Sequence, residues 1–133
     1  MIGLDTNVLV RYLTQDDPAQ SRLATALIED RLSAKNKGFV SCLVLVETLW
    51  VLGDSYGVSR EERITCVEQL ARTRQFELEH AAAVARAVAH AHRARCGVVD
   101  CLIAEIAQEY GCDFVYTFDK KAGASSRFKL LSQ

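Results

Sequence analysis

The chain has 133 residues, of which half are hydrophobic and one is a proline, and its formal net charge is -1. This length predicts a single domain, residues 1–133, with one core. The net charge excludes the strongly basic surface of non-specific nucleic-acid binders, so any contact with nucleic acid must come from local basic clusters or from metal ions.

The cysteines are five in number and show no C-x-x-C spacing, which argues against both a zinc site and a disulfide framework. We expect buried, reduced thiols in a cytoplasmic protein, because nothing at the N-terminus resembles a signal peptide. No apolar run approaches the ~20 residues of a membrane span. The cysteines are Cys42, Cys66, Cys96, Cys101 and Cys112.

The first dozen residues present a carboxylate in an apolar setting. Ile2-Gly3-Leu4 predicts a short buried strand, which ends at Asp5 and is followed by a helix through Leu13. Asp5 could simply cap that helix through the backbone N–H groups of Thr6 and Asn7. It could also serve a binding site, and this stretch alone leaves both interpretations open.

The next helix is predicted from Pro18 towards Ala34, because Asp17 is a good cap, proline suits the first helical position and Gln20 completes a capping box. Its expected apolar face consists of Leu23, Leu27, Ile28 and Leu32.

A short strand, Phe39-Val40, is followed by Ser41, a cap candidate for a helix that continues to about Tyr56. Its side chains are apolar nearly all round, which predicts burial on most sides, with Trp50 in the core. Glu47 lies in this helix and therefore needs a partner, unless it occupies an exposed face.

The second half of the chain repeats the alternation of helices and strands. Another capping box, Ser59 to Glu62, starts a helix through Ala71 or Arg72. The remaining predicted elements are a strand at Phe76–Leu78, a helix from Ala81 to Arg95, a helix with Asp100 in its first turn, a buried strand at Asp113–Thr117 followed by Asp119, and a last strand at Phe128–Leu131.

Strands separated by helices predict an α/β sandwich, with a central parallel sheet and helices on both faces. In such folds ligands bind beyond the carboxyl ends of the strands, and Asp5 and Asp119 both map to that edge. The fold could bring Asp5, Glu47, Asp100 and Asp119 into one pocket.

Four carboxylates that lie close together repel one another unless a cation shares them. An all-oxygen ligand set favours Mg²⁺ or Mn²⁺ over zinc, and such a metal can activate a water and neutralise a phosphodiester. Each acid alone has an ordinary alternative, as a helix cap, a surface group or a turn residue, so the prediction depends on their joint placement.

Four motifs carry a resemblance to the PIN-domain family: I-G-L-D-T-N-V-L at residues 2–9, V-E-T at 46–48, V-V-D-C-L-I-A at 98–104 and T-F-D-K-K at 117–121. The size and the opening resemble the VapC-type toxins of bacterial toxin–antitoxin pairs in particular. The resemblance implies a PIN-like α/β/α sandwich and a Mg²⁺- or Mn²⁺-dependent endoribonuclease. One departure is Cys101, where the family more often has a small residue such as alanine.

By motif, Asp5, Glu47, Asp100 and Asp119 match the acidic quartet of that family, and Thr6, Asn7 and Thr117 match positions that support it. Asp5, Asp100 and Asp119 would hold the metal, while Glu47 would help to orient or deprotonate the attacking water. The resemblance also implies an RNA substrate, a cognate antitoxin protein and a homodimer.

Two basic patches could contact RNA phosphates. Lys120 and Lys121 directly follow Asp119 and are the better candidates, whereas Arg86, His90 and Arg93 form a helix face that we interpret as solvated. Two alternatives stay open: a PIN-fold RNA-binding or assembly factor without activity, and, with less support, a phosphoryl-accepting receiver domain.

Overall fold

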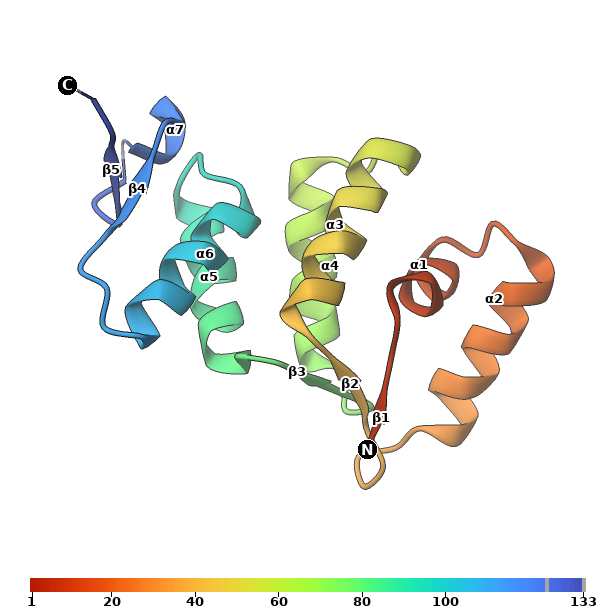
Figure 1. The fold of residues 1–133 in the computed structure, drawn as a ribbon. Coiled ribbons are helices and arrows are strands. Elements are labelled where there is room, and N and C mark those ends of the chain that lie inside the picture. Colours follow the sequence, from red (N-terminus) through yellow and green to blue (C-terminus); the bar gives the residue numbers. More distant parts are fainter. Residues whose placement is uncertain (124, 133) are drawn as a thin grey trace. The chain divides into compact units, whose positions relative to one another are not determined.

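Short parallel strands alternate with helices along the chain, as the sequence predicts (Figure 1). The computed structural model describes residues 1–123 and 125–132. Within it the chain forms two compact units, Met1–Glu79 and His80–Gln133. The α/β fold class with parallel strands is confirmed, whereas the single domain stays a prediction.

The first unit contains a three-stranded parallel sheet in the order β1-β2-β3. Ile2 pairs with Gly38, and Gly38 pairs in turn with Phe76. The elements of this unit are β1 (Ile2–Gly3), α1 (Thr6–Thr14), α2 (Pro18–Thr25), the π-helical segment η1 (Ala26–Arg31), β2 (Gly38–Val40), α3 (Cys42–Tyr56), α4 (Arg60–Arg72) and β3 (Phe76–Leu78).

The second unit packs two helices together and pairs two strands in parallel. Helix α5 presents an alanine face, with Ala83, Ala87 and Ala91 fully buried, and small residues allow α5 and α6 to approach closely. Tyr116 pairs with Lys129 between the strands. The elements are α5 (Ala81–Arg93), α6 (Val98–Glu109), β4 (Val115–Thr117), α7 (Lys120–Gly123) and β5 (Phe128–Leu130).

Helix starts agree well with the local cap signals. The side chains of Asp17, Ser41 and Ser59 accept hydrogen bonds from the backbone N–H groups of Gln20, Val44 and Glu62, which satisfies donors that a helix start leaves unpaired. One detail differs from the prediction at α2: the Gln20 side chain accepts from Arg11.

Helix ends and short elements agree less well. The helix predicted to run towards Ala34 ends at Arg31, because Leu32 has an extended backbone and its N–H closes a π-type bond to Leu27. The helix predicted to reach Arg95 ends at Arg93. The four-residue helix α7 was not predicted.

Several predictions of burial are wrong in the described structure. Ile2, in the edge strand β1, is 38% exposed, and the Tyr116 side chain of β4 is also exposed. Helix α3 buries only one face, so Trp50 is 63% exposed rather than in the core. Leu23 is exposed on α2 although it belongs to the predicted apolar face.

The prediction that the cysteines are buried is correct for Cys96 and Cys101, whereas Cys42 and Cys66 are half-buried. Burial raises the pKa of Cys66 to about 11, so this thiol stays protonated and unreactive at neutral pH. Cys112 is exposed. In the described part of the chain, the helices are all too short or too polar to cross a membrane.

A buried carboxylate ties the second unit together. Glu105 of α6 is 2% exposed, and its oxygens lie 2.8 Å from Arg86 Nε and 3.4 Å from an Arg127 guanidinium nitrogen. A buried charge is tolerated only when it is paired in this way. Arg86 also contacts Glu109, so its charge already has partners within the protein.

Gly38 provides a stability test of the sheet in the first unit. A Cβ at this position would lie 2.7 Å from Leu4 Cδ1 and 2.8 Å from Leu32 Cδ1, and both leucines are buried. We therefore expect Gly38→Ala to lower the free energy of unfolding by about 1–3 kcal/mol, the usual cost of overpacking.

The matched control is Gly3→Ala in the neighbouring strand, where an added Cβ meets nothing within 4 Å. Urea unfolding of both variants measures the difference. Equal stabilities for the two variants would show that Leu4 and Leu32 move aside without cost.

Candidate active site

The backbone and the side chain of Thr6 engage two of the predicted acids. Asp5 follows β1 with an extended backbone, φ -89° and ψ 161°, and its Oδ1 accepts a hydrogen bond of 2.8 Å from the Thr6 backbone N–H. The Thr6 hydroxyl donates to Oε1 of Glu47 on α3. Asp5, Thr6 and Glu47 therefore form one cluster at the start of α1.

This cluster shows the helix cap that the sequence suggested, and the use of Asp5 in a binding site stays a prediction. Asp5 caps α1, as the simpler interpretation held. Its side chain stays exposed in spite of this bond, and it stands next to Thr6, the partner of Glu47. Glu47 lies on an exposed face of α3, yet it has a partner in Thr6, which is only 5% exposed. Asn7 is exposed in the first turn of the same helix.

The second unit holds the other two acids. Asp119 follows β4 in a tight turn, where its N–H donates to the Thr117 hydroxyl at 3.0 Å and its Oδ1 accepts from the Lys121 N–H at 2.8 Å. Thr117 thus fixes the turn that presents Asp119, and its supporting role in an active site stays a prediction.

Asp100 lies half-buried in the first turn of α6. Burial raises the pKa of its carboxyl group above the ordinary value of 3.8, and the nearby negative charge of Asp119 raises it further. A cation bound by these two carboxylates would offset their repulsion.

The donor chemistry fits a hard divalent cation. The residues brought together are carboxylates and hydroxyls, Asp5 with Thr6 and Glu47 in one unit and Asp100 with Asp119 in the other, and such oxygen donors suit Mg²⁺ or Mn²⁺. Neither unit by itself contains, among residues 1–123 and 125–132, three or more His, Cys, Asp or Glu side chains placed to hold a metal. The convergence of all four acids stays a prediction.

The basic residues next to Asp119 are available for a ligand. Lys120 and Lys121 are exposed at the start of α7. Arg86 on α5 is instead held by Glu105 and Glu109.

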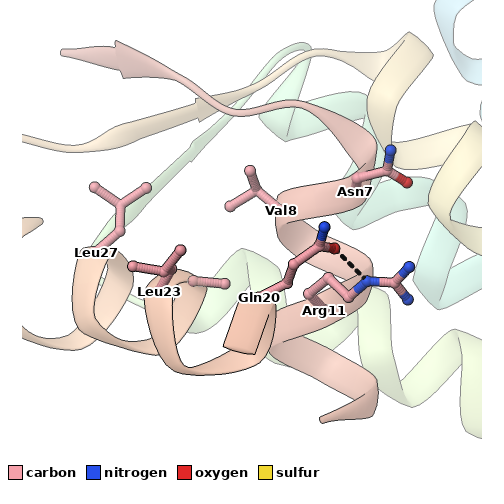
Figure 2. Close-up of a pocket in the computed structure, with 7 residues that line it drawn as sticks. Asn7, Val8, Arg11, Gln20, Leu23 and Leu27 are labelled. Carbon is pink, nitrogen blue, oxygen red and sulfur yellow. Dashed lines mark hydrogen bonds between the residues drawn. The ribbon is translucent and has the colours of Figure 1, made fainter. Parts of the chain in front are cut away.

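Sequence reasoning missed a polar group on the surface of the first unit. Arg11 and Gln20 line a hollow of about 330 Å³ together with Asn7, and Figure 2 shows the three side chains on one side of it. The available signal was the spacing of Asn7 and Arg11, which are four residues apart and therefore share a face of α1.

The repulsion at Asp100 can be measured without any metal. A carboxyl group whose pKa is raised by folding opposes folding when it is ionised, so this penalty grows as the pH rises above 3.8 and is absent at lower pH. In EDTA, Asp100→Asn should therefore melt at a higher temperature than the wild type near pH 7, and the two should converge below pH 3.8.

Asp119→Asn separates the two causes. Because burial is the larger cause, the Asp100 pKa in this variant should fall towards 3.8 without reaching it, as followed by NMR of the carboxyl carbon.

Excess Mg²⁺ should reverse the ranking of the melting temperatures of the wild type and Asp100→Asn, since the wild type would bind the ion more tightly. A wild type that is the more stable protein in EDTA would contradict the pairing of these acids.

Comparison with known proteins identifies the family. None of the curated proteins matches the chain significantly. The family model described as "PIN domain" matches residues 2–125, which include all four acids. Members of this family are generally nucleases that use divalent metal ions. The chain therefore belongs to the PIN-domain family.

Proposed function

We propose that the protein is a Mg²⁺- or Mn²⁺-dependent endoribonuclease, built as one PIN domain over residues 1–133, in which both carboxylate pairs serve a single site. The observation that carries this proposal is the Asp5–Thr6–Glu47 cluster within a chain of a nuclease family. The pairing of Asp100 with Asp119 in the second unit adds further support.

In this mechanism Asp5, Asp100 and Asp119 would hold the metal. The bound cation would supply Lewis-acid stabilisation of the phosphodiester and would make a bound water more acidic. Asp5 is oriented for this role by its cap bond to the Thr6 N–H, and Asp119 by its bond from the Lys121 N–H.

Glu47 would take the proton of the attacking water. Its Oε1 accepts from the Thr6 hydroxyl, which fixes the plane of the carboxylate and leaves Oε2 to receive the proton. Lys120 and Lys121, exposed beside Asp119, would contact the RNA phosphates.

The biological role that we propose is that of the toxin in a VapBC-type pair, acting in the cytoplasm. The arguments are the size of the chain and its opening motif at residues 2–9, which resemble VapC-type toxins. A PIN-fold RNA-binding or assembly factor without activity is the alternative, and an assay of cleavage separates the two.

Cleavage should depend on the metal and on the acids. We expect the purified protein to cleave single-stranded RNA with Mg²⁺ or Mn²⁺ and to lose this activity in EDTA. Asp5→Asn and Asp100→Asn should each abolish cleavage while the far-UV circular dichroism stays unchanged. Asp30→Asn, at an exposed aspartate of η1, is the matched control and should cleave normally. Cleavage that persists in EDTA would contradict the mechanism.

Thr6 should act as a positioning residue. Thr6→Val removes the hydroxyl at nearly constant shape and frees Glu47, so kcat should fall by about 10- to 100-fold, as is typical when the partner of an active-site group is removed. Thr6→Ser keeps the hydroxyl and should retain most of the activity.

A merely structural role of Thr6 predicts a different result. In that case Thr6→Val would lower the melting temperature but leave kcat unchanged below it. The pH profile of kcat adds a second measurement. Loss of an oriented base should flatten the acidic limb of this profile in Thr6→Val, whereas Thr6→Ser keeps the base oriented and should keep the limb.

We further propose a cognate antitoxin that binds beside α3, the helix of Glu47, and places a basic side chain among the acids. The motive is the apolar surface of α3, where Leu43 is 83% and Trp50 63% exposed. A homodimer is also expected. Light scattering of the protein with and without the product of the adjacent open reading frame tests both. A monomer that does not bind this product would contradict both the antitoxin and the homodimer.

A further inference from the structure

A hollow on the first unit lies directly beside the start of α1, where Asp5 caps the helix. It measures about 330 Å³ and is lined by α1, α2 and η1. Apolar side chains of Val8, Leu23 and Leu27 form one part of its lining, and Asn7, Arg11 and Gln20 form the other (Figure 2). An apolar wall with a few polar groups is the usual character of a small-ligand site.

The polar groups of this hollow are held in place by their neighbours. Arg11 Nε donates to Gln20 Oε1 at 2.8 Å, the bond drawn in Figure 2. An Arg11 guanidinium nitrogen lies 3.1 Å from Asp16 and 3.2 Å from the Tyr56 hydroxyl. Because the Gln20 oxygen is engaged, the orientation of its amide is fixed, and its NH2 group is the part available to a ligand.

The electrostatics favour a neutral ligand over an anion. Arg11 is the charged residue of the lining, and its charge is matched by Asp16 at 3.1 Å. The groups that remain for recognition are the carboxamides of Asn7 and Gln20, which are uncharged and planar. A neutral, flat molecule with hydrogen-bonding edges and apolar faces fits such a lining, whereas a phosphate group does not.

We propose that this hollow is a subsite for one unpaired base of RNA. The base would lie against Leu23 and Leu27, with its edge bound by the amides of Asn7 and Gln20. The proposal rests on the proposed nuclease function, because Asn7 stands two residues after Asp5 on the same helix start and would read a base near the phosphate that is cut. It assigns Gln20 as a specificity residue and Arg11 as its positioning residue.

Binding of short ribo-oligonucleotides in EDTA tests the subsite without any cleavage. The probes are hexamers of adenylate, cytidylate and uridylate, and an abasic ribose-phosphate hexamer of equal charge. We expect at least one base-containing hexamer to bind several-fold more tightly than the abasic one, and to shift the side-chain NH2 signals of Asn7 and Gln20 in ¹⁵N NMR spectra.

Two variants at exposed positions keep the test independent of folding. Gln20→Leu should weaken the preferred hexamer about three- to tenfold, the value of one hydrogen bond, and should leave the abasic hexamer unaffected. Leu23→Asp should remove the preference for a base entirely. Gln69→Leu, the same change at an exposed glutamine of α4, is the matched control and should bind as the wild type does.

The outcomes distinguish this proposal from the function on which it rests. Base-dependent binding without metal-dependent cleavage would support the subsite and overturn the nuclease. Cleavage by a protein that binds the abasic hexamer as tightly as the others would support the nuclease and overturn the subsite. The subsite is also overturned if a protein partner, but no oligonucleotide, shifts the amide signals of Asn7 and Gln20.

Discussion

Thr6 uses its two hydrogen-bond donors for two different acids. Its backbone N–H binds Asp5 and its hydroxyl binds Glu47, so one nearly buried residue fixes a strand end, a helix start and a second helix relative to one another. A buried hydroxyl that loses its partner costs about 1–3 kcal/mol, and a bond to an ionised group is stronger than one between neutral groups. The contact of Glu47 with the start of α1 therefore depends on the Thr6 hydroxyl, whereas the bond of Asp5 to the backbone N–H does not.

The sequence predicted those features that depend on neighbouring residues. Asp17, Ser41 and Ser59 each bind an N–H three residues ahead, so their roles can be recognised from short motifs. The strand at Phe76–Leu78 was also predicted with its correct bounds, because alternating burial repeats within three residues. The predictions of burial failed because burial depends on contacts with residues far away in the sequence. The apolarity of α3 does not say which of its sides has a partner, and Trp50 is exposed as a result.

In the candidate site, too, the features that depend on neighbouring residues were predicted and the contacts between distant residues were not. Asp5 and Asp119 each follow a strand, and Asp100 lies in the first turn of a helix, where the helix dipole favours a carboxylate, so the sequence could place them individually. The partner of Glu47 is 41 residues away in the chain, and its identity required the tertiary structure. The same holds for the Arg11–Gln20 bond, since a glutamine at the third position of a helix suggested a capping box instead.

The proposed metal chemistry and the proposed RNA recognition would make different demands on this chain. Carboxylates that hold a cation can stabilise any phosphodiester and therefore give no preference among bases. With a net charge of -1, the protein also lacks the general attraction for phosphates that would hold RNA without regard to sequence. In the function that we propose, selectivity for a base would then come from neutral contacts near the acids. In the subsite that we propose, the amide of Asn7 lies on α1, the helix that Asp5 caps, and the amide of Gln20 lies on α2. The choice of base would then be coupled through α1 to the position of Asp5, a proposed metal ligand.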